Sequence, residues 1–312
     1  MFASDAPSVP QVPRCQVMPL ADDQVSFLVQ GVERLRWHFG SKYPRPFFFP
    51  LVGSSGLSLT RMGHPGAPDH DHHRSIWFAH HKVLGVDFWS DKTEARIRQK
   101  RWLAYQDGDD EALMAVELGW YDGHDPQELL DQQLIVAVRP ADEGQTLVEL
   151  QSTFTPKAKS LELGQTNFGL LAVRVAKTIS ATFGGGRLTN SEGATGEPKV
   201  FGKPARWMDY TGRITNEGYE GITYFEHPKN PGYPNAWHVR DDGWMTSSAC
   251  MRGAITLTQD SPLTLRYLLH AHREALETAR AERQASQFGD LPAYEVVKSE
   301  RKNTSNEVRR VS

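Results

Sequence analysis

The sequence predicts an all-β protein, a large antiparallel β-sandwich with one short helix near its C-terminal end. Three observations support this prediction. Short apolar or alternating runs, rich in β-branched and aromatic residues, recur along most of the chain. Gly, Pro, Asp or Asn separates these runs, as is usual where turns join strands. Finally, 39% of the 312 residues are hydrophobic, which suffices for a substantial core.

The strand-like runs are short and bounded by turn residues. We expect strands at residues 25–31, 46–53, 83–89, 113–121, 129–140, 146–156, 205–212, 219–228 and 261–272. Within residues 147–154 the side chains alternate between two faces, with Val148, Leu150 and Phe154 on one of them. Such alternation is typical of a sheet with one buried and one solvated face.

One helix and two polar ends complete the predicted organisation. Residues 273–287, REALETARAERQASQ, consist largely of strong helix formers. The chain shows neither an internal repeat nor a linker between domains. We therefore expect a flexible leader at residues 1–22, a single β domain at 23–290 and a polar tail at 291–312.

Composition and charge exclude several classes of function. The formal net charge is −3, so the chain lacks the basic surplus typical of proteins that bind nucleic acid or anionic membranes. No apolar run approaches the roughly 18 residues that a membrane-spanning helix needs, and the N-terminal residues lack the features of a signal peptide. Cys15 and Cys250 are the only cysteines, which excludes a disulfide framework. We therefore expect a cytoplasmic protein with two free thiols.

The most uneven segment is residues 64–81, HPGAPDHDHHRSIWFAHH, which contains six of the chain's 12 histidines. If this segment is a strand, His70 and His72 share a face with their Cα atoms about 6–7 Å apart. Two imidazoles at that spacing can bind one divalent metal, such as Zn, Mn or Fe, with further ligands from other strands. On the same strand His73 and His81 would lie about 26 Å apart, so a metal cage formed by this segment alone is excluded if the segment is extended and does not turn between them.

Two other interpretations of the same segment stay open. The histidines can work without metal, as acids, bases or ligand-binding groups, or they can be hydrogen-bonded polar residues of a loop. Arg74 cannot act as a base, but its planar guanidinium suits a carboxylate or a vicinal diol. Trp77 and Trp89 offer flat apolar surfaces to a sugar ring, although such residues more often belong to the core.

A second candidate segment is residues 227–244, HPKNPGYPNAWHVRDDGW. Its prolines stiffen the loop around Asn230, because each fixes its own φ and restricts the preceding residue. Trp237, His238 and Arg240 follow on a short expected strand, with His238 and Arg240 on one face. A stacking ring beside a proton-transfer group and a guanidinium suits a polyol or sugar acid. The alternative is an elaborate surface loop.

Polar residues between these segments offer carboxylates to the site. Asn190, Ser191 and Glu192 form a polar turn, and Asp209 lies on an expected strand. An ordinary turn or surface role is the alternative for both carboxylates. The glycine-rich stretch at residues 184–197 lacks the spacing of a nucleotide-binding loop, so it does not indicate such a site.

These segments, with PRPFFFPLVGSSGLSLTR and LTNSEGATGEPKVFGKPARWMDYTG, resemble in order those of the bacterial PmoA-like domain of unknown function. The resemblance covers residues 44–272. The label borrows the name of a methane oxygenase subunit, an integral membrane protein, and this chain has no spanning segment, so the label implies no such activity. The resemblance does imply a galactose mutarotase-like β-supersandwich, the fold of sugar epimerases, lyases and hydrolase domains.

The resemblance also implies where the site residues lie. One wall of a pocket would contain His72, His73, Arg74, Trp77 and His81. The other wall would contain Asn190, Glu192, Asp209, Asn230, Trp237, His238 and Arg240. The family usually has a Phe-Gly-His-Gly turn after its tryptophan, whereas this chain has FAHHK. His80 is therefore an alternative equivalent of the family's histidine, and the role of His81 is open.

We therefore expect a carbohydrate-active enzyme that acts on a sugar or an oxidised (keto) glycoside by epimerisation, β-elimination or hydrolysis. His73 or His238 would be the base and Glu192 or Asp209 the acid, while arginines hold substrate oxygens. Two alternatives stay open. One is a non-catalytic sugar-binding module, and the other is a metal-dependent enzyme with His70 and His72 as ligands. The expected partner is a small carbohydrate rather than nucleic acid or membrane.

Overall fold

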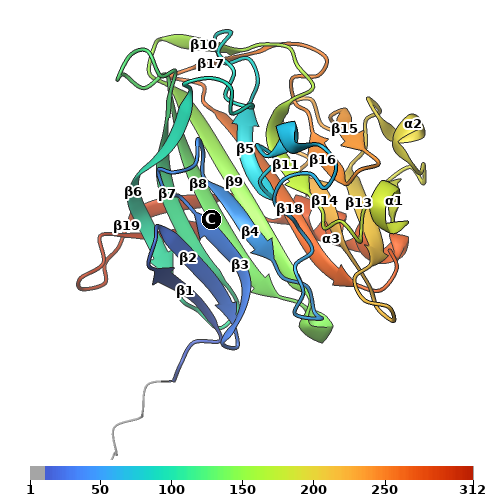
Figure 1. Cartoon of the computed structure of the whole chain (residues 1–312). Coiled ribbons are helices and arrows are strands. Elements are labelled where there is room, and N and C mark those ends of the chain that lie inside the picture. The colour runs from blue at the N-terminus through green and yellow to red at the C-terminus, as the bar shows by residue number, and fades with distance from the viewer. Residues whose placement is uncertain (1–10, 312) are drawn as a thin grey trace, which may run out of the picture.

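Two eight-stranded antiparallel sheets lie face to face in the structure, a computed structural model that describes residues 11–311 (Figure 1). The first sheet contains, in spatial order, β1 (Cys15–Leu20), β2 (Gln24–Val29), β3 (Val32–His38), β4 (Phe47–Leu51), β5 (Ile76–His80), β11 (Gly169–Arg174), β16 (Trp244–Ser247) and β15 (Trp237–Arg240). The second contains β12 (Arg187–Asn190), β13 (Trp207–Arg213), β14 (Tyr219–Glu226), β18 (Leu263–Arg273), β9 (Thr146–Pro156), β8 (Leu130–Pro140), β7 (Ala112–Tyr121) and β6 (Arg96–Gln106).

Smaller elements join and cover these sheets. Two strand pairs are formed by β10 (Ser160–Leu163) with β17 (Ile255–Thr258) and by β19 (Tyr294–Lys298) with β20 (Asn306–Arg310). The helices are α1 (Ala181–Gly184), α2 (Glu197–Val200) and α3 (Thr278–Asp290), with the 3₁₀ turns η1 (Pro68–His70) and η2 (Asp142–Gly144). No helix among the described residues is long and apolar enough to cross a membrane.

The main core lies between the two sheets because successive side chains of a strand point to opposite faces. In β8, Leu134, Val136 and Val138 belong to this core, whereas Ile135 and Ala137 belong to a cluster on the other face. Burying each large aliphatic side chain contributes about 1.5–3 kcal/mol. Both faces of the second sheet are therefore buried.

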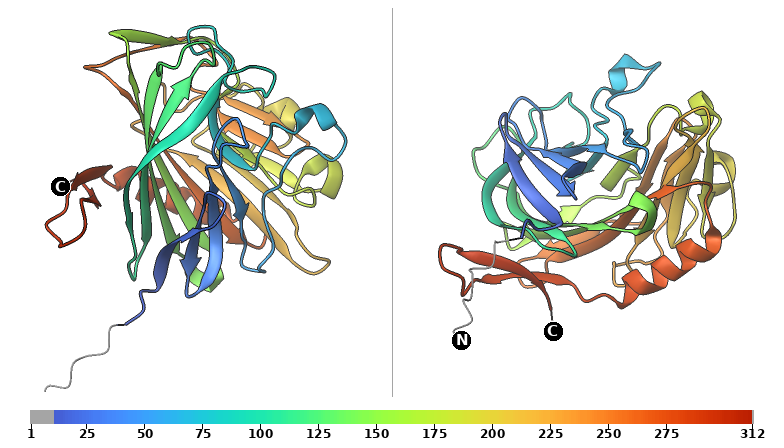
Figure 2. Two further views of the ribbon diagram at one scale, coloured as in Figure 1. Left: turned by 60° about the vertical axis from the view of Figure 1, so that its left-hand side comes forward. Right: turned by 90° about the horizontal axis from the view of Figure 1, so that it is seen from below.

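Two C-terminal elements cover the outer face of the second sheet (Figure 2). The β19–β20 hairpin packs Tyr294 and Val308 on Ile135 and its neighbours, and α3 packs Ala281 and Phe288 on Trp207, Phe225 and Leu268. The outer face of the first sheet is covered by loops instead, one of which places Trp89 against Trp77. Because loops, rather than a helix and a hairpin, cover the outer face of the first sheet, that face has room for a ligand-binding site.

The predicted all-β sandwich with a C-terminal helix is confirmed. The predicted strand at residues 83–89 is wrong, because Val83 and Val86 hydrogen-bond to each other in a tight turn. The strand of this region is β5, which lies earlier, inside the histidine-rich segment.

Both predicted polar ends contain strands. The described part of the leader includes β1, which pairs with β2 and buries Cys15 and Val17, while residues 1–10 lie outside the described residues. The expected tail at 291–312 contains the β19–β20 hairpin, and Arg310 from it donates to the buried carboxylate of Glu149 at 2.7 Å. Strand pairing and this ion pair fix segments whose composition alone indicates flexibility.

Candidate functional site

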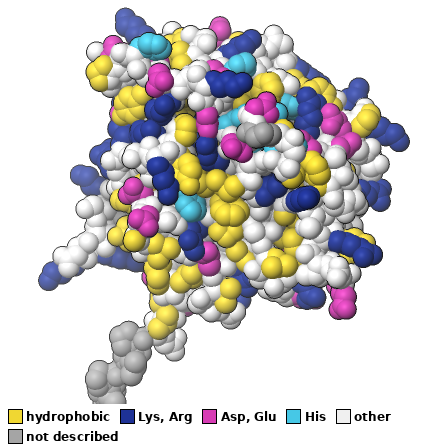
Figure 3. Space-filling view, viewed as in Figure 1, with side chains coloured by type: hydrophobic (Ala, Val, Ile, Leu, Met, Phe, Trp, Pro, Cys, Tyr) yellow, Lys and Arg dark blue, Asp and Glu magenta, His cyan; other side chains and the backbone are white. Residues whose placement is uncertain are grey.

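A cavity of about 470 Å³ opens on the outer face of the first sheet, and we call it the histidine cavity. Its lining residues are Asp69, His70, His72, His73, His81, Asp87, Trp89, Ser90, Lys92, Phe168, Arg174, His238, Arg240, Asp242 and Trp244. Figure 3 shows histidine, acidic and basic side chains gathered on the upper part of this side of the molecule. Segments far apart in the sequence therefore meet here.

Strand alternation aims these side chains away from the main core. In β5, Ile76 and Phe78 point into the core while Trp77 points outward. In β15, Trp237 is part of the core while His238 and Arg240 line the cavity. The two faces of each strand thus separate packing from ligand-accessible groups.

Aromatic rings form one wall of the cavity. The ring of Trp244 lies 5.2 Å from that of Trp89 and 5.3 Å from that of Trp77, and Trp89 lies 5.6 Å from Phe168. Trp77 is fully buried behind the others. Such flat apolar surfaces suit the apolar face of a sugar ring, while polar groups on the rim can bind its hydroxyls.

The histidines of residues 64–73 gather by a turn rather than by a strand. η1 reverses the chain, and the backbone N–H of His73 donates to the carbonyl of His70 at 3.0 Å. The rings of His70 and His72 lie 5.7 Å apart, and those of His72 and His73 4.2 Å apart. The strand geometry predicted for His70 and His72 is therefore wrong, although the cluster itself exists.

Burial keeps two of these imidazoles neutral. It lowers the pKa of His72 to about 4, with a further contribution from Arg45. Burial also lowers the pKa of His73 far below its usual range, and the nearby Arg174 guanidinium adds to the effect. At neutral pH both side chains are therefore uncharged, and each can accept a hydrogen bond.

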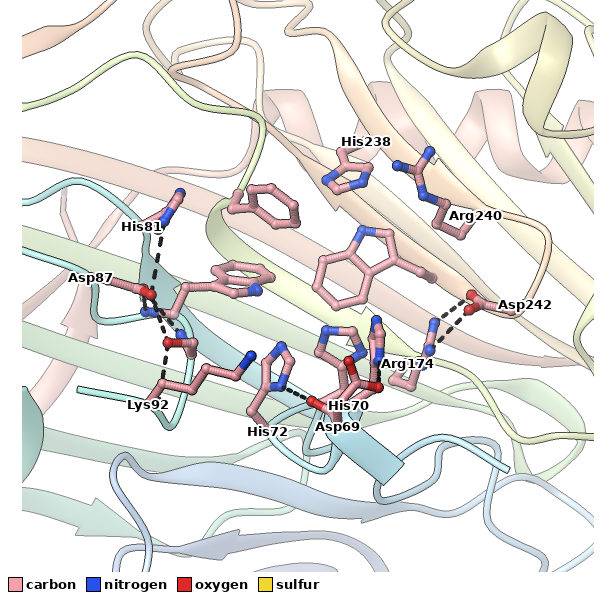
Figure 4. Close-up of a pocket in the computed structure, with 15 residues that line it drawn as sticks. Asp69, His70, His72, His81, Asp87, Lys92, Arg174, His238, Arg240 and Asp242 are labelled. Atoms are coloured by element: carbon pink, nitrogen blue, oxygen red, sulfur yellow. Dashed lines mark hydrogen bonds and ion pairs between the residues drawn. The ribbon is translucent and has the colours of Figure 1, made fainter. Parts of the chain in front are cut away.

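His238 is the best-oriented imidazole of the cavity (Figure 4). Its Nδ1 lies 3.1 Å from the carbonyl oxygen of Asn167. Because a carbonyl only accepts, Nδ1 carries the proton and Nε2 is left with a free lone pair. Burial, followed by the charge of Arg240, lowers the pKa of His238 to about 4. The centre of its ring lies 5.6 Å from that of the Trp244 ring.

An ion pair between a buried arginine and a partly exposed aspartate lines the cavity. The side chain of Arg174 is 1% exposed and donates to Asp242 at 2.5 Å, and Asp242 also bonds His64 at 2.9 Å. Burial alone would raise the pKa of Asp242, but Arg174 and then His64 outweigh it and lower the pKa. Asp242 is therefore an ionised structural partner rather than an acid.

Sequence reasoning missed several lining residues, namely Asp87, Lys92, Phe168, Arg174, Asp242 and Trp244. One signal was available. Arg174 ends the otherwise apolar strand β11, GLLAVR, and a lone charge in a buried strand requires a partner. Lys92 and Phe168 lie in loops without a distinctive pattern.

Other predicted residues lie near the cavity without lining it. Arg74 donates to Asp91 at 3.2 Å, and His80 is fully buried with Nε2 at 3.1 Å from the carbonyl of Gly164. His81 does line the cavity, with Nε2 at 3.8 Å from Asp87. Of the two candidate equivalents, His81 is thus the one that reaches the cavity.

The structure does not bring the remaining predicted residues to the cavity. Trp237 is fully buried and donates through Nε1 to the carbonyl of Ala205, so it cannot stack on a ligand. Asn230 is bonded to the backbone of Arg266 and anchors its loop. The side chain of Asn190 accepts two backbone N–H groups of its own turn.

The two predicted acids also lie elsewhere. Glu192 is exposed on that turn and accepts a hydrogen bond from Ser191. Asp209 is buried on the outer face of the second sheet, where it bonds Thr211, Thr223 and His272. Neither carboxylate reaches His73 or His238, because β12 and β13 belong to the other sheet.

The predicted metal ligands do not fit a metal site. Over residues 11–311, no group of three or more His, Cys, Asp or Glu side chains is placed to hold a metal ion. Nδ1 of His70 is bonded to Asp69 at 2.8 Å, and Nδ1 of His72 lies 3.2 Å from the carbonyl of the same residue. These contacts leave Nε2 of each ring for other partners, so the lack of a third ligand among the described residues decides against the site. We therefore derive no chemistry through a metal.

Comparison with solved structures finds similar folds at low identity. YeaD from Salmonella typhimurium, a provisionally assigned mutarotase, has 11% identity and a TM-score of 0.37, with 86% of this chain and 97% of that chain covered. A GalM/aldose epimerase homologue from C. elegans has 8% identity and a TM-score of 0.34, with 84% and 100% covered. A polysaccharide lyase has 9% identity and a TM-score of 0.32, with 93% and 36% covered.

Comparison by sequence places the chain in a family. No curated protein matches it. The model of DUF6807, described as a family of unknown function, matches residues 24–286. These residues include most of α3 and every strand of the two large sheets except β1. The predicted membership of a family without established activity is thus shown, whereas the PmoA-like label stays a resemblance. This chain belongs to the DUF6807 family.

Proposed function

We propose that the chain is a carbohydrate-active enzyme that binds a sugar or an oxidised (keto) glycoside in the histidine cavity and uses His238 as its base. One observation carries the proposal. A neutral imidazole, held in one tautomer by the carbonyl of Asn167, lies against the ring of Trp244 in a cavity of about 470 Å³. A base beside a stacking surface is what proton transfer to or from a bound sugar requires.

The lining groups suit an uncharged, oxygen-rich ligand. Three cationic side chains (Lys92, Arg174 and Arg240) and three carboxylates (Asp69, Asp87 and Asp242) line the cavity. Arg174 is paired with Asp242, and Arg240 is paired with Glu197. The remaining donors and acceptors of these groups can bind hydroxyl groups. The balance of charges favours a neutral sugar over a strongly charged ligand.

Among the reactions open to a sugar, proton abstraction next to a carbonyl fits best. Nε2 of His238 would take the proton from the carbon beside the ketone, and the electron pair would pass to the carbonyl oxygen as an enolate. Arg240 lines the same cavity; its Nη1 is paired with Glu197 at 2.8 Å, and the other N–H groups of its guanidinium can donate to that oxygen. The enolate would then expel a β-oxygen substituent, which takes the proton from the imidazolium, or it would regain the proton on carbon.

Direct hydrolysis by a pair of carboxyl groups fits less well. That chemistry uses one carboxyl group as an acid and a second as a base or nucleophile. The predicted acids Glu192 and Asp209 lie outside the cavity. Each carboxylate that lines it already has a partner: Asp242 is held ionised by Arg174, Asp69 is bonded to His70, and Asp87 accepts from Ser90. The arrangement therefore favours a reaction that begins with proton abstraction by a base over hydrolysis by two carboxyl groups.

The test is turnover of a panel of ordinary and keto glycosides in deuterated water, followed by mass spectrometry. The expected result is solvent deuterium on carbon in the recovered sugar, or an unsaturated keto sugar that is lighter by one water than the hydrolysis product. Substituting His238→Gln should lower turnover by ~10²-fold or more with little change in binding. His124→Gln is the matched control, because His124 is exposed and lies outside the cavity. Thermal melting points must match before rates are compared.

Three results would contradict the proposal. Product that carries neither carbon-bound deuterium nor a new carbon–carbon double bond would indicate direct hydrolysis. Sugar binding without any product, unchanged in His238→Gln, would indicate a non-catalytic binding module. Stoichiometric Zn, Mn or Fe in wild type that is lost in His72→Ala would indicate a metal-dependent enzyme.

A further inference from the structure

A second hollow adjoins the histidine cavity, and we call it the adjoining hollow. It has a volume of about 750 Å³ and is lined by His81, Lys82, Glu162, Gly164, Gln165, Thr166, Asn167, Phe168, Phe201 and Met251. His81 and Phe168 line both spaces. The two spaces are therefore neighbouring parts of one surface groove, and Phe168 lies between them.

His238 lies at the junction of the two spaces. Its ring lies edge-on to Phe168 at 4.9 Å and to Phe201 at 5.3 Å. Phe201 lines only the adjoining hollow, whereas His238 lines only the histidine cavity. Asn167 lies at the same junction. Its backbone carbonyl orients His238, and the residue also lines the adjoining hollow.

The adjoining hollow has the groups that a second carbohydrate unit needs. Phe201 is a partly exposed aromatic ring with the Arg240 guanidinium over it, 4.9 Å from the ring centre. Gln165, Thr166 and Asn167 add amide and hydroxyl groups to the same hollow. Lys82 and Glu162 add one charge of each sign. This combination of a ring with hydrogen-bonding groups resembles that of the histidine cavity, although the hollow contains a single histidine.

We propose, on the basis of the proposed function, that the substrate is a glycoside of at least two units rather than a free monosaccharide. One sugar lies against Trp244 and Trp89, and the second sugar or aglycone lies between Phe168 and Phe201. The bond that joins the units then lies near His238. In β-elimination from a keto sugar this carbon–oxygen bond breaks, and the departing oxygen takes the proton from His238 and leaves through the adjoining hollow.

Binding of sugars by calorimetry tests this inference. The probes are α- and β-linked disaccharides, their keto derivatives, and the monosaccharides of which they consist. Wild type should bind its best disaccharide at least roughly 10-fold tighter than either monosaccharide, as a second set of stacking and polar contacts implies. Gln165→Trp, a substitution of an exposed residue, fills the adjoining hollow and should remove this preference without weakening monosaccharide binding.

Two further variants serve as a control and as a second test of the two-unit inference. Gln127→Trp makes the same substitution at an exposed residue outside both spaces, and it should keep the disaccharide preference. Phe201→Ala should reduce the preference by removing the ring instead of blocking the hollow. Equal binding of monosaccharides and disaccharides, or an unchanged preference in Gln165→Trp, overturns the two-unit inference alone. No binding of any sugar overturns the proposed function and the inference with it.

Discussion

Two regions of the molecule combine histidine with aspartate, and they differ in how completely their hydrogen bonds are satisfied. In the histidine cavity, no described group bonds Nε2 of His238, and Nδ1 of His73 is buried without a partner. On the outer face of the second sheet, Asp209 accepts from Thr211, Thr223 and His272. The first region keeps its groups available for a ligand, whereas Asp209 and His272 of the second use theirs within the fold; beside them, Nε2 of His270 is buried without a partner.

Protonation follows the same division. Burial lowers the pKa of His238 to about 4. For His272 burial also acts to lower the pKa, but Asp209 at 2.9 Å outweighs it and raises the pKa. Nδ1 of His272 lies 3.2 Å from the carbonyl of Arg273, so both ring nitrogens face acceptors, as in an imidazolium. The comparison shows that partners, rather than residue types, decide whether a histidine can act as a base.

The largest expected effect is a loss of stability in acid. His80, His227 and His238 are each at most 2% exposed, and burial lowers the pKa of each to about 4. Between pH 6.5 and 4 the unfolded chain therefore binds protons that the folded chain does not, and each histidine reduces stability by roughly 1.4 kcal/mol per pH unit. Urea unfolding at pH 7 and pH 5 should show a drop of several kcal/mol.

His272 contributes with the opposite sign. Its raised pKa means that its contribution is complete below about pH 6.5 and is lost as the pH rises through the folded-state value. Replacing His238 by Gln should therefore flatten the acid side of the stability profile, and replacing His272 by Gln should not. An identical flattening in both variants would show that the two regions do not differ in protonation.

The next effect is the loss of the buried pair. His272→Leu keeps the approximate volume of the side chain but leaves the carboxylate of Asp209 buried without its cation, so we expect a destabilisation of about 3–5 kcal/mol. The double variant with Asp209→Leu should recover part of this loss because no unpaired charge stays buried. Urea unfolding at pH 7 measures both, and a loss under about 1 kcal/mol in His272→Leu would contradict the ion pair.

The sequence could predict the strands but not which sheet they join. Alternation in residues 146–156 sufficed for β9, and the helix at residues 273–287 was found as α3 with later bounds. β13 was also predicted, but alternation cannot tell whether the face with Asp209 meets the cavity or α3. That choice depends on pairing with β12 and β14, which brings in His272 from far along the chain.

The lining of the histidine cavity was predicted in part for a similar reason. His72, His73, His238 and Arg240 lie in dense polar segments, and they do line the cavity. Trp237 lies in the same dense segment, but its neighbours on β15 place it in the main core. Local sequence therefore identifies segments rich in functional groups, while the sheet decides which members of a segment face the ligand.

A smaller effect of opposite sign is expected in the cavity. His73 is 7% exposed, its Nδ1 lacks a partner, and its ring lies 4.7 Å from that of Trp244. His73→Leu should therefore raise stability by about 1 kcal/mol, because a buried polar atom without a hydrogen bond is replaced by an apolar one. The same substitution destabilises at His272, so the pair of variants separates a ligand-directed histidine from a structural one. A destabilised His73→Leu variant would contradict this distinction.

The smallest effect is expected at Glu192, the predicted acid that lies outside the cavity. Its carboxylate is exposed and accepts only from the hydroxyl of Ser191 at 2.9 Å among the described residues. Glu192→Gln should change the free energy of unfolding by no more than about 0.5 kcal/mol and leave turnover unchanged.

Asn190→Ala is the informative neighbouring variant, because the side chain of Asn190 accepts the backbone N–H groups of Glu192 and Ala194. Loss of these hydrogen bonds should lower the free energy of unfolding by about 1 kcal/mol by loosening the turn. Turnover of a keto glycoside, measured beside urea unfolding, checks both variants. A tenfold fall in turnover for Glu192→Gln at unchanged stability would restore this carboxylate as the acid, and would show that His238 does not return the proton by itself.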